Sequence, residues 1–314
     1  MKVISEQDFI SSKKTAVALG VFDGIHRGHQ DVVKKATSLK TQGYSPAVFT
    51  FNTNSVTSKG NGKIDALISN ELKYKKLENL GIEYIYSPEF CTIKDLTAEK
   101  FVEKILVGKL NAGVVICGEN FRFGKGAFCG HKELSQICEG YDIKTIIVPF
   151  TMYNGQPISS TEIRRLIKEG SIDIANFLLG YDFHFKGEVV HGNSIGRTIS
   201  FPTINQNFER SQVIPRFGVY ASITKIGEKE YHSITNIGVK PTIGNENSPL
   251  AETHIIDFDS DLYGEKIVVY LKRFIRPEKK FNGLDELKGQ LVADTQKAKA
   301  ILSYNNEKGG FQNE

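Results

Sequence analysis

The first 150 residues alternate short apolar runs with longer amphipathic stretches, and this alternation is the strongest constraint on the fold. Short apolar runs are typical of buried strands, while the stretches between them carry the spacing of amphipathic helices. Capping residues support the helices, with Ser69 or Asn70 and Thr97 at two starts and Gly43 and Gly81 at two ends. The pattern predicts an open parallel sheet covered by helices, which binds ligands outside the carboxyl ends of its strands. The predicted strands are TAVALG (15–20), PAVFTF (46–51), EYIYS (83–87), AGVVICG (112–118) and KTIIVPF (144–150).

The residue pattern changes from helical to strand-like after two short helical stretches at 159–170 and 171–180. From about Phe183 to Arg276, β-branched and aromatic residues recur between turn residues, which predicts a compact antiparallel barrel. A helical pattern at 284–302 is expected to pack on this barrel. Because no internal repeat links the halves, we expect two different domains, at 1–182 and 183–314.

Charge and composition argue against two classes of partner. The chain has 40 Lys and Arg against 36 Asp and Glu, an excess too small to predict nucleic-acid binding. No apolar run approaches the roughly 20 residues of a membrane span, and the start MKVISEQDFISSKK lacks a signal-peptide core. The cysteines form no CxxC pair, which favours idle thiols in a reducing compartment and predicts a cytoplasmic protein. They are Cys91, Cys117, Cys129 and Cys138.

The stretch GVFDGIHRGHQDVV (20–33) follows the first predicted strand and opens a helix. Gly24 permits a sharp turn there, and His26 and His29 lie three residues apart in the first helical turn, facing the same way. The free N–H groups of that turn attract anions, and Gly28 leaves room for a phosphate. Two imidazoles there can donate hydrogen bonds as charge builds on a polyphosphate. We expect ATP to bind here, with attack at its α-phosphate; surface or helix-capping histidines are the alternative.

Two further polar clusters fit a triphosphate site. Ser160, Thr161 and Arg164 open the later helix at 159–170 and offer short hydroxyl donors and a forked cation. Asn120 lies two residues after the predicted strand at 112–118, at the end of the sheet where it can contact ribose or phosphate. Taken alone, the first cluster is more typical of an ordinary Ser/Thr helix cap with an exposed arginine than of a binding site.

The β-rich half carries its own candidate site. Thr203 and Asn205 lie two residues apart on a predicted strand, so their oxygens project to one face and suit Mg²⁺ and a bound phosphate. Glu252 opens ETHIIDFD and can accept the proton of an attacking hydroxyl if it faces a pocket. The alternatives are a turn stabilised by Pro202 and Asn205, and a simply exposed glutamate.

GVFDGIHRGH, GENFRFG and ISSTEIR occur in an order and spacing that resembles the N-terminal half of the bifunctional riboflavin kinase/FMN adenylyltransferases, the bacterial FAD synthetases. That half is an HxGH nucleotidyltransferase. The resemblance implies that the FMN phosphate attacks the α-phosphorus of ATP, releasing pyrophosphate and forming FAD without a covalent enzyme intermediate. It places the nucleotide site on residues of the three motifs: Gly20, Phe22, Asp23, Gly24, His26, Gly28, His29, Asn120, Ser160, Thr161 and Arg164.

The second half resembles the riboflavin kinase module of the same family through FKGEVVHGNSIGR, FPTIN, FGVYA, TNIGVKPT and ETHIIDFDSDLYG. The resemblance implies that Thr203 and Asn205 hold MgATP, and that Glu252 is the base when the riboflavin 5′-hydroxyl attacks the γ-phosphate. Gly192 and Gly196 would let backbone amides approach phosphate. The expected ligands are riboflavin, FMN, ATP and Mg²⁺, with no nucleic acid or membrane partner; the sequence sets no oligomeric state.

Two alternatives stay open because three stretches, 50–55, 127–128 and 181–183, differ from the family's usual pattern. The chain can have kept only one of the two activities. It can also be a non-catalytic regulatory protein that responds to flavin or nucleotide on the same scaffold. The intact HxGH pattern and Glu252 favour catalysis, because binding alone does not require a positioned base.

Overall fold

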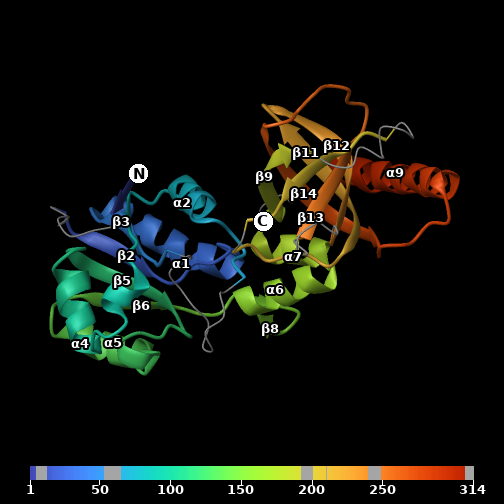
Figure 1. The fold of residues 1–314 in the computed structure, drawn as a ribbon. Coiled ribbons are helices and arrows are strands. Elements are labelled where there is room, and N and C mark those ends of the chain that lie inside the picture. The colour runs from blue at the N-terminus through green and yellow to red at the C-terminus, as the bar shows by residue number, and fades with distance from the viewer. Residues whose placement is uncertain (5–12, 53–64, 192–200, 210, 240–248, 308–314) are drawn as a thin grey trace. The chain divides into compact units, whose positions relative to one another are not determined.

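The computed structural model describes residues 1–4, 13–52, 65–191, 201–209, 211–239 and 249–307, and side chains up to 303. The chain divides into two compact units, Met1–Ser160 and Thr161–Glu314 (Figure 1). This division falls earlier in the chain than the expected boundary at 182/183. Helix α7 (Ile172–Leu179) is tied to the second unit, since Asn176 Nδ2 donates to the Leu271 carbonyl at 2.9 Å.

The first unit is built on a six-stranded parallel sheet with the order β1-β4-β3-β2-β5-β6. The chain runs from β2 to β3 and β4 in one direction and then places β5 on the other side of β2. Strand order therefore reverses between β2 and β5, which makes their carboxyl ends the switch point of the sheet. The strands are β1 (Lys2–Ile4), β2 (Thr15–Leu19), β3 (Ser45–Phe49), β4 (Tyr84–Tyr86), β5 (Ala112–Gly118) and β6 (Lys144–Val148).

Helices cover both faces of this sheet (Figure 1). Val17 and Leu19 of β2 belong to an apolar cluster with residues of α4, η3 and α5 on one face. The alternate residues of β2 face the other side, where α1 lies against β2, β3 and β5. The elements outside the sheet are α1 (Arg27–Ser38), η1 (Leu39–Gln42), α2 (Asn70–Asn79), α3 (Phe90–Ile93), α4 (Ala98–Phe101), η3 (Val102–Val107), η4 (Lys125–Ala127), α5 (His131–Glu139) and a hairpin of β7 (Met152–Tyr153) and β8 (Gln156–Pro157).

The second unit contains a closed barrel with the strand order β10-β13-β12-β11-β14-β9, preceded by α6 (Ser160–Glu169) and α7. Every neighbouring pair of its strands is antiparallel. The predicted fold class, a parallel-sheet domain followed by an antiparallel barrel and a terminal helix, is therefore confirmed. The strands are β9 (His184–Val190), β10 (Ile204–Asn207), β11 (Gly218–Ile226), β12 (Lys229–Val239), β13 (Pro249–Ile255) and β14 (Lys266–Arg276).

Helix α9 (Leu284–Glu307) packs on the outside of the barrel, as the sequence predicts. Ala298 and Leu302 of the helix join Val219, Ala221 and Ile234 of the barrel wall in one apolar cluster. The Arg276 guanidinium also donates two hydrogen bonds to a carboxylate oxygen of Asp294, at 3.0 and 2.7 Å. Apolar burial and a charged pair together fix the helix to the wall.

A line of buried hydroxyls runs through the inside of the barrel. Since Val219 and Ala221 of β11 pack outward on α9, alternation along the strand places Ser222 and Thr224 inward. The hydroxyls are linked in the order Thr224, Ser233, Ser222, Thr235 and Thr253, with oxygen–oxygen distances of 2.8 to 2.9 Å. All five residues are fully buried, so the line satisfies polar groups that would otherwise be unpaired.

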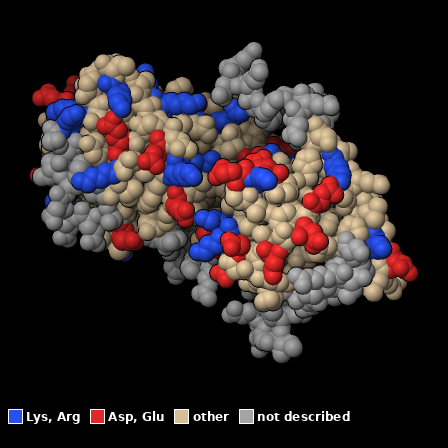
Figure 2. Space-filling model, turned by 90° about the horizontal axis from the view of Figure 1, so that it is seen from above, with Lys and Arg blue, Asp and Glu red and all other residues tan. Residues whose placement is uncertain are grey.

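The surface carries mixed charge. On the face shown in Figure 2, Lys and Arg are interspersed with Asp and Glu. Among the described residues, no helix is long and apolar enough to span a bilayer. All four cysteines are free thiols, of which Cys117 and Cys138 are buried.

Candidate active sites

The loop between β2 and α1 is a tightly packed turn with unusual backbone angles. Phe22, Gly24 and Ile25 have positive φ values of 54°, 87° and 41°. The Phe22 ring is 1% exposed and lies so close to Gly20 that a Cβ there would be 2.9 Å from Phe22 Cζ. Positive φ at residues with a Cβ costs free energy that the surrounding packing must offset. Gly20 and Phe22 therefore fix the turn that starts α1 at the carboxyl end of β2.

His26 and His29 lie side by side at the start of α1. Their rings stack, with centroids 3.6 Å apart and planes 20° from parallel, which confirms that they face the same way. His26 is also the N-cap of the helix, because its Nδ1 accepts a hydrogen bond from the His29 N–H at 3.3 Å. An accepting Nδ1 places the proton of the neutral His26 ring on Nε2. The capping alternative thus holds for His26.

His29 is held in its neutral form. Burial, followed by the positive charges of His26 and Lys73, lowers its pKa well below the ordinary value. Its Nδ1 is buried and has no hydrogen-bond partner among the described residues. Phe22 contacts the ring edge-on, with the ring centroids 5.3 Å apart, and restrains it. The site therefore holds a neutral imidazole at His29 beside the helix-capping imidazole of His26.

The other predicted residues of the first half have different surroundings. The Asp23 carboxylate is 4% exposed and accepts the Leu67 N–H at 3.0 and 3.3 Å, which gives it an anchoring role inside the loop. Ser160 Oγ donates to the Asp23 carbonyl at 2.8 Å, so this predicted residue does meet the histidine loop. Asn120 is exposed just after β5, at the switch point. Thr161 and Arg164 follow on α6 and belong to the second unit.

Two features beside the histidines were missed by the sequence reasoning. Lys73 on α2 is fully buried and donates to the Phe51 carbonyl at 2.6 Å. Thr151 Oγ1 donates to the Asp31 carboxylate at 2.5 Å and lies 3.4 Å from a Cβ built at Gly28. Lys73 had a signal in the sequence, because it precedes the buried Leu77 by four residues and so occupies the apolar face of its helix.

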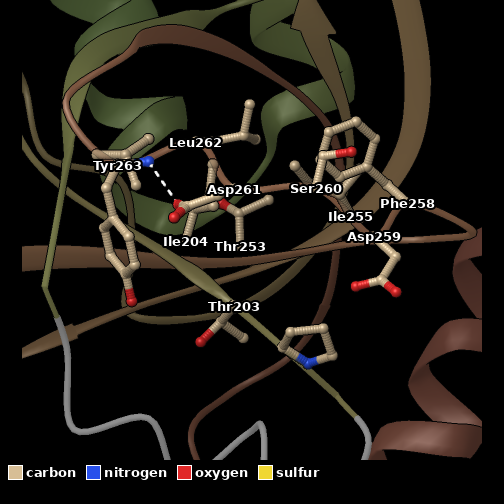
Figure 3. A pocket seen from close by; sticks show the side chains of 12 residues that line it. Thr203, Ile204, Thr253, Ile255, Phe258, Asp259, Ser260, Asp261, Leu262 and Tyr263 are labelled. Atoms are coloured by element: carbon tan, nitrogen blue, oxygen red, sulfur yellow. Dashed lines mark hydrogen bonds between the residues drawn. The ribbon is translucent and has the colours of Figure 1, made fainter.

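The barrel contains a pocket of about 490 Å³ (Figure 3). One side comes from the strands, with Ile204, Thr253 and Ile255, and the other from the segment after β13. In that segment Asp261 accepts the Tyr263 N–H at 3.0 Å. The pocket mixes apolar side chains with a few polar groups, as small-molecule sites do. Its lining residues are Val189, Pro202, Thr203, Ile204, Thr253, Ile255, Phe258, Asp259, Ser260, Asp261, Leu262 and Tyr263.

Thr203, Asn205 and Glu252 lie close to one another on the barrel wall. Thr203 lines the pocket immediately before β10, and Asn205 pairs in register with Glu252 on β13. Asn205 is 5% exposed, and its Oδ1 is buried with no hydrogen-bond partner among the described residues. Glu252 lies mid-strand between Asn205 and Asn236 and is half-buried. Neither Asn205 nor Glu252 belongs to the pocket lining, and Gly192 and Gly196 lie outside the described residues.

The buried Asn205 Oδ1, which has no hydrogen-bond partner among the described residues, points to a ligand-binding site. Buried polar atoms are almost always hydrogen-bonded, so the Asn205 Oδ1 fits a site that is completed by a ligand. Amide and hydroxyl oxygens are ligands that Mg²⁺ accepts together with water and phosphate oxygens. The donor set of Thr203 and Asn205 therefore fits this ion.

The topology, a parallel-sheet unit followed by a closed antiparallel barrel, and the stacked histidines and barrel pocket fit the class of two-unit nucleotide-dependent transferases. The family model for FAD synthetase matches residues 9–162, and that for riboflavin kinase matches residues 179–302. The chain belongs to the bifunctional riboflavin kinase/FMN adenylyltransferase family.

Two named relatives agree with this assignment, and a solved structure with a different name has the same fold. The bifunctional riboflavin kinase/FMN adenylyltransferase of Listeria monocytogenes is 36% identical, with 91% of this chain and 92% of that protein covered. The protein of the same name from Bacillus subtilis is 34% identical with the same shares covered. A crystal structure described as a macrolide-efflux protein from Streptococcus pneumoniae aligns with a TM-score of 0.86 at 30% identity, covering 95% of this chain and 98% of that one.

Proposed function

We propose that this chain carries out two consecutive ATP-dependent transfers. The barrel phosphorylates riboflavin to FMN, and the parallel-sheet unit transfers AMP from ATP to FMN, giving FAD and pyrophosphate. The stacked His26–His29 pair at the switch point is the observation that carries the proposal, because it supplies two aligned donors where such sheets bind nucleotides.

For adenylyl transfer, the chain's contribution is orientation and charge stabilisation. An oxygen of the FMN phosphate attacks the α-phosphorus of ATP, and the bond from that phosphorus to the bridging oxygen of pyrophosphate breaks. The Nε2–H groups of His26 and His29 donate to the oxygens on which charge builds, and the N-terminus of α1 adds its free amides. Gly24 and Gly28 leave the backbone open to phosphate. Asn120 and Ser160, both in the same unit as the histidines, hold the remainder of the nucleotide.

We assign residues 1–182 to the adenylyltransferase half and residues 183–314 to the kinase half, although the compact units divide after Ser160. Thr161 and Arg164 lie on α6, and their role in nucleotide binding stays a prediction from the sequence.

For phosphorylation, Glu252 takes the proton of the riboflavin 5′-hydroxyl as that oxygen attacks the γ-phosphorus of ATP. ADP leaves when the bond from the γ-phosphorus to the bridging oxygen breaks. Thr203 and the Asn205 Oδ1, which is unpaired among the described residues, would hold Mg²⁺ together with the ATP phosphates. The ion neutralises phosphate charge when bound. The pocket beside Thr203 offers apolar walls to a substrate ring.

A single assay tests both halves. The protein is incubated with riboflavin, ATP and Mg²⁺, and FMN and FAD are separated by chromatography. Both products support the proposal, and their absence from a chain that binds flavin identifies a regulatory protein instead. FMN alone means that the first site does not transfer AMP. The four free thiols fit a reducing compartment such as the cytoplasm. Cell fractionation tests this location, because a cytoplasmic protein is recovered in the extract after the membranes are removed.

A further inference from the structure

His254 on β13 lies beside the proposed magnesium site, and the chemistry above gives it no role. Its Nδ1 is 2.8 Å from the carbonyl oxygen of Pro202. Its ring also packs against that of Phe201, with centroids 5.0 Å apart and planes 55° from parallel. One side chain thus contacts both residues that precede Thr203, which lines the pocket (Figure 3).

The barrel register places His254 with the residues of the proposed kinase site. Asn205 pairs with Glu252 across β10 and β13. Carried two residues along, the same antiparallel register sets Thr203 opposite His254. Since side chains alternate along a strand, His254 shares a face of β13 with Glu252. His254 therefore belongs to the same part of the barrel wall as the groups proposed to act on ATP.

Strand pairing alone does not hold the chain just before Thr203. Pro202 has no backbone N–H to donate, and the paired residues of β10 begin only at Ile204. The hydrogen bond from His254 therefore ties the chain to β13 at a point where the ladder has ended. Because Thr203 follows Pro202 directly, this bond restricts the position of its hydroxyl on the wall.

The same bond sets which ring nitrogen of His254 has the proton. A carbonyl oxygen only accepts hydrogen bonds, so Nδ1 is the donor. The neutral ring in this tautomer and the protonated ring both have an Nδ1–H. The bond to Pro202 is therefore kept in either form of the imidazole.

We propose that His254 is a positioning residue for riboflavin phosphorylation, which donates from Nδ1 to the Pro202 carbonyl and so holds Thr203 in place for Mg²⁺ and ATP. This inference rests on the proposed riboflavin kinase activity. Residues that orient a metal ligand without touching the metal commonly set its affinity. Loss of His254 should therefore weaken binding of the ion and the nucleotide, and leave the proton acceptor Glu252 in place.

The test uses the full chain with three substitutions. His254→Leu keeps a branched side chain but removes the donor, whereas His254→Asn restores an N–H donor at the same number of bonds from the backbone. His232→Leu removes another half-buried histidine of the barrel, on β12, and is the matched control. FMN formation is measured over a range of Mg²⁺ and ATP concentrations. FAD formation from added FMN is the internal reference, and thermal unfolding reports folding.

Two further measurements do not depend on turnover. Binding of ADP, the product of phosphorylation, is measured by calorimetry in the presence of Mg²⁺. NMR of the wild-type chain with nitrogen-labelled histidines identifies the protonated nitrogen of His254, whose signal is assigned by its loss in His254→Leu.

We expect His254→Leu to raise the Mg²⁺ concentration for half-maximal FMN formation, and the KM for ATP, about three- to tenfold, the scale of one neutral hydrogen bond. Saturating Mg²⁺ and ATP should restore most of kcat, and FAD formation should stay at the wild-type level. ADP binding should weaken by the same factor, and His254→Asn should recover most of the loss. In the wild type, Nδ1 of His254 should have the proton.

Three results overturn the inference. In the first, His254→Leu behaves like His232→Leu. In the second, His254→Asn is as impaired as His254→Leu, or His254→Leu unfolds at lower temperature with unchanged dependence on Mg²⁺ and ATP, which identifies a structural ring. In the third, the neutral ring has its proton on Nε2, a result that needs no variant to fold. A wild-type chain that makes no FMN contradicts the proposed function itself, so the two failures are distinguishable.

Discussion

Around the start of α1 the buried polar groups can carry charge, whereas the barrel wall near Thr203 is built from hydroxyl and amide groups. Asp23, His26 and Lys73 are each at most 5% exposed. In the barrel, the corresponding buried groups are Asn205 and Thr253. Burial shifts the pKa of a charged group, while a neutral amide or hydroxyl only needs a hydrogen-bond partner. The activity of the first site should therefore depend on pH, whereas the second site should be completed by the ligand that bonds to its unpaired group.

The two sites also differ in how far their phosphate-binding groups are arranged before the ligand binds. In the parallel-sheet unit the imidazoles are oriented before substrate arrives, since the two rings are stacked and His26 caps the helix through its Nδ1. In the barrel the Asn205 Oδ1 has no partner among the described residues, so the site gains a bond when its ligand binds. The predictions below test this contrast.

The largest effect is expected for Glu252→Gln. Loss of the proposed base should lower riboflavin phosphorylation about 10²- to 10⁴-fold, while FAD formation from added FMN stays at the wild-type level. The two rates are measured on one sample, with Glu230→Gln, an exposed glutamate on β12, as the control. Equal loss of both activities would contradict the assignment of separate sites.

His29→Ala should have the opposite selectivity. Removing one transition-state donor should lower FAD formation about 10²- to 10³-fold and spare FMN formation. The measurement is the ratio of FAD to FMN made from riboflavin over time. If FMN fell along with FAD, the imidazole would be needed for the fold of the chain instead.

The stability of the parallel-sheet unit should rise with pH through the Lys73 titration. Its folded pKa of about 8 lies below the ordinary value of 10.5, so between these values the unfolded chain binds more protons and stability increases with pH. Relative to Lys73→Met, the free energy of unfolding should rise by about 3 kcal/mol across this range. Urea denaturation at pH 7.5 and pH 11 measures it. Parallel curves for the two proteins would contradict a depressed pKa.

The smallest effect is expected for Asn205→Ala. The Mg²⁺ concentration needed for half-maximal FMN formation should rise at least about tenfold, because a direct ligand is removed and even the loss of an outer-shell partner costs this much. Thermal unfolding should change little, because the Oδ1 makes no hydrogen bond among the described residues. Asn207→Ala, an exposed residue on β10, is the control. A large loss of stability with unchanged Mg²⁺ dependence would assign Asn205 a structural role.

Much of the fold could be predicted because its signals are local. The five predicted strands of the sheet and the cap residues Ser69 and Thr97 are found where periodicity and capping place them. Strand β1 was missed because three edge residues show no alternation. Helix α5 was also missed, although Leu134 and Cys138 lie four residues apart on its buried face.

The sites were less predictable, because burial and register are properties of the folded chain. The spacing of His26 and His29 indicates a shared face, but not that His26 caps the helix. Lys73 was passed over since lysines are ordinarily solvated. The pocket wall from Phe258 to Tyr263 comes from a segment without helix or strand, so its apolar residues follow no regular spacing that a sequence could reveal. The register that sets Glu252 opposite Asn205 depends on strand pairing across the barrel.

The line of buried hydroxyls ends at the pocket. Its last member, Thr253, lines the pocket and is hydrogen-bonded to Thr235. Each hydroxyl has one proton and two lone pairs, and either atom of the Thr235–Thr253 bond can be the donor. Five hydroxyls share four hydrogen bonds, so one proton is left over within the line. Thr253 can therefore meet either a donor or an acceptor group of a ligand if its neighbours reorient their hydroxyl protons.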